Sequence, residues 1–166
     1  MSNAQDGLIT NGLSTPLASE HSTQVSLASL REKQAGLNQH RQSILNRVPD
    51  QNSWGQFKSG YISFEDIAYL SAATDDEFAL LTGKNEDVLF HGTHGNCHIE
   101  QSDVLMESLK THKLELTIHS HPDRDRIVAS SDDRKFIASI GQKTSKIISS
   151  YTGQIIEFNA NMFDDI

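Results

Sequence analysis

Two histidines and an aspartate, His119, His121 and Asp133, have the residue types and spacing to bind a metal ion. Both histidines belong to the stretch 114–121, where apolar and polar residues alternate as in a β-strand. Residues two apart in a strand point to the same face, and Pro122 ends the hydrogen-bond ladder, so we expect both imidazoles at a strand end. Asp133 follows at the expected start of a helix. Two imidazoles and one carboxylate give zinc three protein ligands and leave a fourth position open.

Each half of this pattern also has a simpler interpretation. A His-x-His pair occurs in many proteins that bind no metal, and Ser130-x-x-Asp133 is a helix N-cap pattern. The order and spacing of the two halves together favour a zinc site. Such a site lowers the pKa of a bound water towards about 7 and so supplies a nucleophile at neutral pH.

The order His119-Ser120-His121-Pro122, then Ser130-Ser131-Asp132-Asp133, resembles the signature of the JAMM (MPN-plus, JAB-domain) zinc metallopeptidases. The resemblance covers about residues 63–160. It implies Zn²⁺ as cofactor, the ligands His119, His121 and Asp133, and a Ser130 that steadies the oxyanion of a tetrahedral intermediate. Members of the family hydrolyse peptide or isopeptide bonds of protein substrates, often next to ubiquitin-like tails, and some are modules of larger toxin or phage proteins.

The resemblance also implies a glutamate from an earlier strand, acting as general base on the metal-bound water and returning the proton to the leaving amine. We assign this role to Glu77, which begins an apolar strand-like run and lies 119 − 77 = 42 residues before His119. The alternatives are Glu65, Glu86 and Glu100.

Two features depart from the family pattern. Eight residues separate His121 from Ser130, where seven is commonest, and a longer polar loop costs little because loop closure depends weakly on length. The run after Glu77 lacks the glycine that often follows the family's glutamate, which leaves the register of Glu77 open. Asp132 is an alternative ligand to Asp133 if the helix starts differently.

A second cluster of zinc-type side chains comprises His91, His94, Cys97 and His98. Their spacing matches no zinc template, and adjacent residues of a strand point to opposite faces. We therefore expect a small buried Cys97 and histidines that line a loop near the cleft. The sequence has neither a Gly-x-Ser-x-Gly nucleophile elbow nor a glycine-rich phosphate loop.

Strands and helices alternate in the part of the chain that carries these residues. We expect strands at 77–82, 88–90, 96–99, 114–121, 145–151 and 154–159, and helices that start at the Ser63-Phe-Glu-Asp66 capping box, at Ser102 and at Ser130. This alternation predicts an α/β (α+β) domain over about residues 54–166, with one mixed sheet flanked by helices. The family resemblance implies the MPN, cytidine-deaminase-like type of this fold.

The N-terminal 50 residues differ in composition and expected structure from the rest of the chain. Residues 1–24 are rich in small polar side chains, and we expect disorder there. Residues 25–50 follow, with Leu30, Leu37 and Ile44 seven apart, and we expect a helical linker or a docking helix that Pro49 closes.

Charge and composition limit the partners. The net charge is 14 − 22 = −8, and residues 51–166 carry the whole excess, with 10 basic against 18 acidic side chains. Phosphate backbones bind basic surfaces, so we expect no nucleic-acid partner. A single cysteine, no run of about 20 apolar residues and no basic-then-apolar leader favour a cytoplasmic protein without a membrane partner.

A non-enzymatic function is the alternative interpretation. Domains with this fold also serve as interaction scaffolds after losing their ligands. Here both histidines, Ser130 and Asp133 are all present. A scaffold has little physical reason to keep four site residues, so the sequence favours an enzyme.

Overall fold

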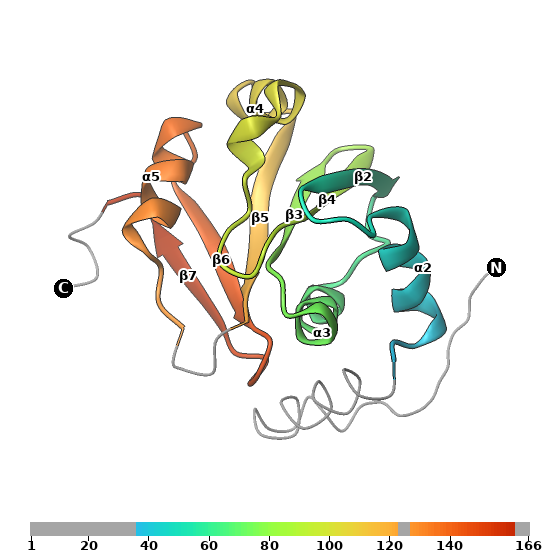
Figure 1. The fold of residues 1–166 in the computed structure, drawn as a ribbon. Helices are drawn as coiled ribbons and strands as arrows, with labels where there is room; N and C mark the ends of the chain where they lie inside the picture. Colours follow the sequence, from blue (N-terminus) through green and yellow to red (C-terminus); the bar gives the residue numbers. More distant parts are fainter. Residues whose placement is uncertain (1–35, 123–126, 162–166) are drawn as a thin grey trace.

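The described part of the chain, residues 36–122 and 127–161 of the computed structural model, contains one six-stranded mixed sheet (Figure 1). The strand order is β2-β4-β3-β5-β6-β7. Neighbouring strands are antiparallel except for β5 and β6, which run parallel. The strands are β2 (Ser53–Lys58), β3 (Phe78–Gly83), β4 (Glu86–His91), β5 (Leu114–His121), β6 (Thr144–Ser149) and β7 (Ile155–Asn159).

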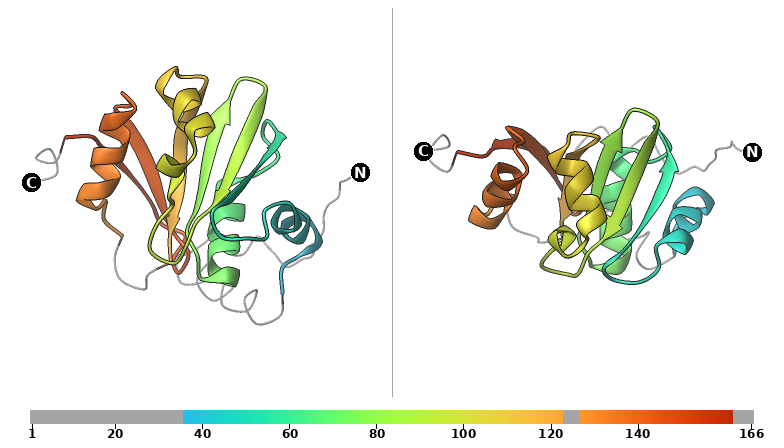
Figure 2. Two further views of the ribbon diagram at one scale, coloured as in Figure 1. Left: turned by 45° about the horizontal axis from the view of Figure 1, so that its top comes forward. Right: turned by 90° about the horizontal axis from the view of Figure 1, so that it is seen from above.

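Helices cover both faces of the sheet (Figure 2). The bounds are α2 (Gln39–Arg47), α3 (Phe64–Thr74), η3 (Ile99–Gln101), α4 (Asp103–Lys110) and α5 (Ser131–Ser139). Helices α2 and α3 pack on one face, in the core cluster that contains Phe78, Leu80 and Ile118, whereas α4 and α5 pack on the other face over Ala79, Leu81 and Leu116. Among the described residues, no helix combines the length and the apolar character that a membrane span needs.

A β-bulge in β5 decides which face the two histidines occupy. Leu116 pairs with Leu81, but Ile118 pairs with Leu80, so Thr117 is an extra residue without a partner position. Leu116 consequently faces α4 and α5, whereas Ile118 faces α3, although strict alternation would put both on one face. The bulge therefore turns His119 to the α5 side of the sheet. Bulges of this kind often re-aim side chains next to functional sites.

Two expected elements differ in the structure. No strand forms at 96–99, where a loop leads into η3, because both edges of β4 are already paired with β2 and β3. Of the expected helical segment 25–50, the structure describes residues 36–50, in which α2 starts at Gln39 after the Asn38 N-cap and residues 36–38 are not helical. Residues 25–35 lie outside the described residues, as does the expected disorder at 1–24.

Helix α2 docks on the sheet domain through apolar and charged contacts. Ile44 and Val48 are fully buried in the core cluster of α3. Asp66, in the first turn of α3, accepts hydrogen bonds from Arg41 Nε at 2.9 Å and from the Ser63 N–H at 2.9 Å, and its Oδ2 lies 3.0 Å from His40 Nε2. Burial by itself raises the pKa of Asp66, but His40, the Arg41 charge and the Ser63 N–H together lower it below the ordinary 3.8.

We expect Asp66→Asn to destabilise the fold by about 3 kcal/mol at pH 7, because it removes the buried carboxylate that Arg41 and His40 contact. A carboxyl whose pKa is depressed in the folded state stabilises it above the unfolded-state pKa, and this contribution disappears as pH falls through the folded-state value. Urea denaturation at pH 7 and at about pH 3 measures both effects. An equal difference between wild type and variant at both pH values would contradict the role of the charged carboxylate.

Candidate metal centre

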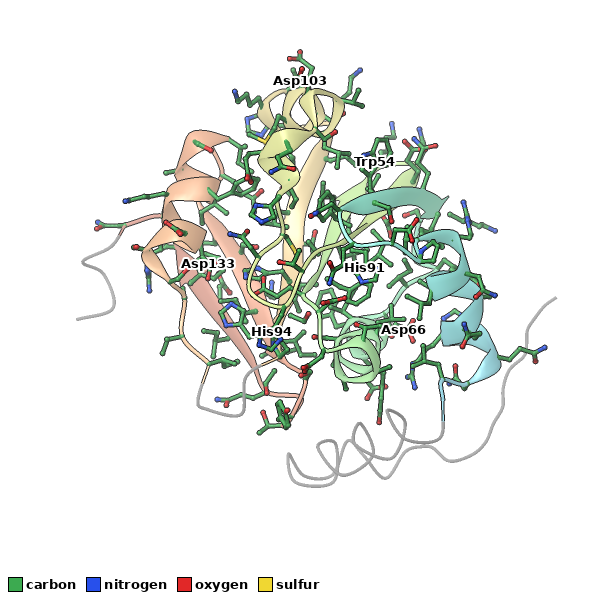
Figure 3. The ribbon with its side chains drawn as sticks, in the orientation of Figure 1. Trp54, Asp66, His91, His94, Asp103 and Asp133 are labelled. Atoms are coloured by element: carbon green, nitrogen blue, oxygen red, sulfur yellow. The ribbon has the colours of Figure 1, made fainter. Side chains whose placement is uncertain are left out.

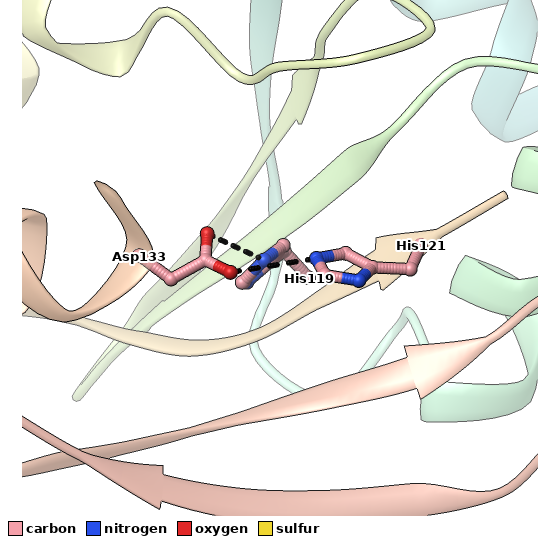
Figure 4. Close-up of side chains that lie close together, drawn as sticks. All are labelled: His119, His121 and Asp133. Carbon is pink, nitrogen blue, oxygen red and sulfur yellow. Dashed lines mark ion pairs between the residues drawn. The ribbon is translucent and has the colours of Figure 1, made fainter. Parts of the chain in front are cut away.

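The end of β5 and the start of α5 bring His119, His121 and Asp133 together (Figure 4). His119 Nε2 lies 3.2 Å from Asp133 Oδ1, and His121 Nε2 lies 3.5 Å from Asp133 Oδ2. One ligand atom from each residue can be chosen so that all three lie within 4.8 Å of one another. In the part of the chain that the structure describes, this is the one such group of three His, Cys, Asp or Glu side chains.

The capping of α5 fixes Asp133. Ser130 is the N-cap: its Oγ accepts the Asp133 N–H at 3.0 Å, and Asp133 Oδ2 accepts the Ser130 N–H at 2.9 Å. Next to it, the buried Arg134 donates to the carbonyl of Asn159 at 3.0 Å and so ties the start of α5 to the end of β7. Asp133 thus takes part in the helix cap and also belongs to the candidate metal centre. The capping and the metal-binding interpretations of Ser130-x-x-Asp133 are therefore compatible.

Electrostatics favour the charged form of Asp133. Burial raises the pKa of this carboxyl, but the two histidines and the Ser130 N–H outweigh burial and hold its pKa well below its usual range. Its place in the first turn of α5 adds the positive end of the helix dipole. The carboxylate is therefore ready to bind a cation.

The surroundings of His119 fit a metal ligand. Its side chain is 6% exposed; within the described structure Nδ1 has no hydrogen-bond partner, and Nε2 has only the 3.2 Å contact to Asp133 Oδ1. Buried polar atoms normally have an interaction partner, and a bound cation can be that partner. Ligand atoms about 2.0–2.1 Å from a tetrahedral zinc ion lie about 3.3 Å apart, which is close to the observed 3.2 and 3.5 Å separations.

A cleft of about 530 Å³ opens over these residues, and Glu77 and Ser130 line it with them. The loop before η3, which includes His94, also lines it; His94 and Asp133 are both labelled in Figure 3. The other lining residues of the cleft are Ala79, Gly95, Asn96, Cys97, Ile99, Glu100, Leu116, Asp132, Lys135 and Phe136.

Glu77 directly precedes β3 and lies beside the candidate metal centre. The β3–β5 register ends with Ala79 paired to His119, and Glu77, two residues before Ala79, lines the same cleft as His119 and His121. Ala79 faces the α5 side, and Glu77, two residues earlier, shares that face.

The alternative glutamates occupy different places. Glu65 lies in the first turn of α3, on the opposite face of the sheet, and Glu86 begins β4 at the end remote from His119. Glu100, in η3, lines the same cleft as Glu77 and is the alternative closest to the metal centre. Asp132 also lines the cleft but is exposed, whereas Asp133 meets both histidines.

The four side chains of the second cluster do not converge. His91 is buried, with Nδ1 2.8 Å from the Val48 carbonyl and Nε2 2.8 Å from Asp76 Oδ2. Both ring nitrogens of His91 therefore contact protein oxygen atoms, so neither is directed at an open metal position. His94 Nδ1 instead lies 2.8 Å from the Asp75 carbonyl, and His98 Nδ1 lies 3.3 Å from Glu100.

We expect His91→Ala to lower the free energy of unfolding by about 3 kcal/mol, because it removes the buried partner of Asp76 and the ring that stacks on Phe78. The ring centroids of Phe78 and His91 lie 4.3 Å apart. Urea denaturation measures the loss. Zinc content should stay at the wild-type value, and a variant that folds but loses its zinc would show that the second cluster holds metal after all.

Cys97 lines the cleft but is a poor nucleophile. Burial, and after it the negative charges of Glu77, Asp133 and Glu100, raise the pKa of its thiol well above the usual range. The thiol sits against Gly92, where an added Cβ would lie 2.4 Å from the Asn96 carbonyl and 2.8 Å from Cys97 Sγ. Only glycine allows this close turn of the loop that walls the cleft.

Sequence reasoning missed the residues that complete the cleft. Lys135 and Phe136 line it from the first turns of α5, and Asn96 from the loop. The helical spacing of Phe136, three residues after Asp133, was the one available signal.

Searches against protein-family models, curated proteins and solved structures found no match to this chain.

Proposed function

We propose that this chain is a zinc-dependent hydrolase of peptide or isopeptide bonds in protein substrates, of the JAMM type. The observation that carries the proposal is the convergence of His119, His121 and Asp133 from two elements, in a cleft that Glu77 also lines. A buried imidazole whose Nδ1 has no hydrogen-bond partner and a carboxylate held in its charged form fit a ligand set.

The chain's own residues would divide the work of hydrolysis. Zinc, when bound, supplies a Lewis acid that polarises a carbonyl and lowers the pKa of water. Glu77 takes a proton from the attacking water and passes it to the leaving amine. Ser130 Oγ already accepts the Asp133 N–H, so its own proton can be donated to the oxyanion.

We also propose that the sheet is of the MPN, cytidine-deaminase-like type. The support is the order of elements: a strand that ends in two ligands, a helix that begins with the third, and a parallel strand after it. In open sheets with parallel strands, ligands bind beyond the carboxyl ends of those strands. The candidate metal centre lies at that end of β5.

A hydrolysis assay tests the proposed function. Protein stripped of metal and protein reloaded with zinc are incubated with a pool of internally quenched fluorescent peptides of mixed sequence, beside Asp133→Asn treated in the same way. We expect cleavage by the reloaded wild type alone. A set of isopeptide-linked substrates is tested in the same way. Equal cleavage with and without zinc would contradict the proposal, and so would no cleavage of either substrate set.

A further inference from the structure

Backbone hydrogen bonds hold Glu77 from the β4 side. Its N–H donates to the Thr93 carbonyl at 2.8 Å, and its carbonyl accepts the Gly92 N–H at 2.7 Å. The Thr93 N–H in turn donates to the Asn96 carbonyl at 2.7 Å, which closes the loop beside the cleft. The main chain at Glu77 is thus fixed to the extension of β4.

On the β5 side, a side chain instead of the main chain provides the hydrogen bond. The ladder between β3 and β5 ends at the pair Ala79–His119. One residue further, the Phe78 N–H donates to Ser120 Oγ at 2.9 Å, in a fully buried bond. Ser120 stands between His119 and His121, and its side chain points to the opposite face from theirs.

This bond links the two halves of the proposed site. Ser120 belongs to the strand segment that carries both histidines, and Phe78 is the direct neighbour of Glu77. The Phe78 ring is held as well, since it stacks on His91. Any sliding of the start of β3 along β5 would break the Ser120 bond and shift the Glu77 carboxylate relative to the histidines.

We propose that Ser120 is a positioning residue that sets the place of the Glu77 carboxylate relative to the His119–His121–Asp133 centre. The proposal rests on the proposed function, since it assumes that Glu77 acts at this centre. Ser120 touches neither metal nor substrate in this role. Its hydroxyl replaces the carbonyl that a continued ladder would offer to Phe78, and so lets the two strands separate at the cleft.

The test compares Ser120→Ala and Ser120→Thr with Glu77→Gln and with a matched control, Ser145→Ala. Ser145 is also buried in the sheet and also makes a side-chain bond to the main chain, donating to the Leu116 carbonyl at 2.7 Å. The readouts are amide hydrogen exchange at Phe78, the visible absorption spectrum of the Co²⁺-substituted protein, and kcat and KM for the fastest-cleaved peptide of the quenched pool.

We expect Phe78 to be protected in wild type and to exchange about 5- to 10-fold faster in Ser120→Ala, as the loss of one buried hydrogen bond implies. The Co²⁺ spectrum should shift in the same direction as in Glu77→Gln, and kcat should fall about 10- to 100-fold with little change in KM. Ser120→Thr, which keeps the hydroxyl, and Ser145→Ala should resemble wild type in spectrum and kcat.

Two results would overturn the positioning role of Ser120 alone. One is a fast-exchanging Phe78 amide in wild type, which requires no folded variant. The other is a Ser120→Ala protein with wild-type spectrum and kcat while Glu77→Gln differs from wild type. If wild type binds no Co²⁺, the proposed function fails instead. If Glu77→Gln matches wild type in both spectrum and kcat, Glu77 is not the base, and the positioning role of Ser120 fails with it.

Discussion

Glu77→Gln should retain its zinc and lose hydrolysis by about 10²- to 10⁴-fold, the usual contribution of a general base. Glutamine keeps the size of the side chain and its main-chain contacts but cannot take up a proton at neutral pH. Glu77 lines the cleft and is not one of the three candidate ligands, so metal content should not change. Elemental analysis and kcat on the cleaved peptide measure the two quantities on one preparation.

Glu100→Gln is the matched comparison, because Glu100 is the alternative glutamate that lines the same cleft. Glu100→Gln changes a carboxylate to an amide in the same cleft but should lower kcat far less than Glu77→Gln. If the two variants exchange these outcomes, Glu100 is the base. Loss of zinc from Glu77→Gln would make Glu77 a ligand rather than a base.

His119→Ala should weaken zinc binding by more than about 100-fold, since changes to residues that merely support a ligand already cost 10- to 100-fold. His119 is the most buried of the three candidate ligands, its Nδ1 has no hydrogen-bond partner within the described structure, and its Nε2 contacts only Asp133. Competition titration against a fluorescent zinc chelator measures the affinity, and circular dichroism checks that the variant is folded.

His94→Ala provides the control for that titration. His94 lines the cleft, its side chain is 61% exposed, and its Nδ1 lies 2.8 Å from the Asp75 carbonyl. It also lies outside the candidate ligand group. Its zinc affinity should match that of wild type within the error of the titration. Equal loss of affinity in the two variants would mean that the cleft as a whole, and not the His119 ligand, holds the metal.

Local signals in the sequence were sufficient for most elements of the fold. The capping box at Ser63 and the N-cap at Ser130 are present as predicted, and the strands expected at 77–82 and 88–90 are present as β3 and β4. These elements depend on nearest neighbours along the chain, which sequence reasoning can read. The mixed α/β sheet flanked by helices follows from them.

The elements that depend on distant partners could not be read in this way. β2 was not predicted, because Gly55 and Gln56 weaken its strand pattern; in the structure Gly55 packs against Val48, where an added Cβ would lie 3.1 Å from Cγ1. The β5 bulge was not predicted either, since the sequence of β5 alternates without a break. Only pairing with β3 shows that Thr117 is the extra residue.

The candidate site also has parts that local sequence indicates and parts that depend on distant residues. The spacing of His119 and His121 and the cap at Ser130 are local, and the structure brings both histidines to Asp133. The nearness of Glu77 depends on the β3–β5 register, 42 residues apart in the chain (119 − 77), and was open from sequence. The role that we propose for Ser120 could not be seen at all, because its partner Phe78 is equally distant in sequence.

A crystal structure of the zinc-loaded protein, with anomalous diffraction recorded on both sides of the zinc absorption edge, tests the central claim most directly. We predict one anomalous peak, about 2.0–2.2 Å from a nitrogen of His119, a nitrogen of His121 and an oxygen of Asp133, with a fourth position open. No peak after zinc loading, or a peak held by His91, Cys97 or other residues instead, would contradict it.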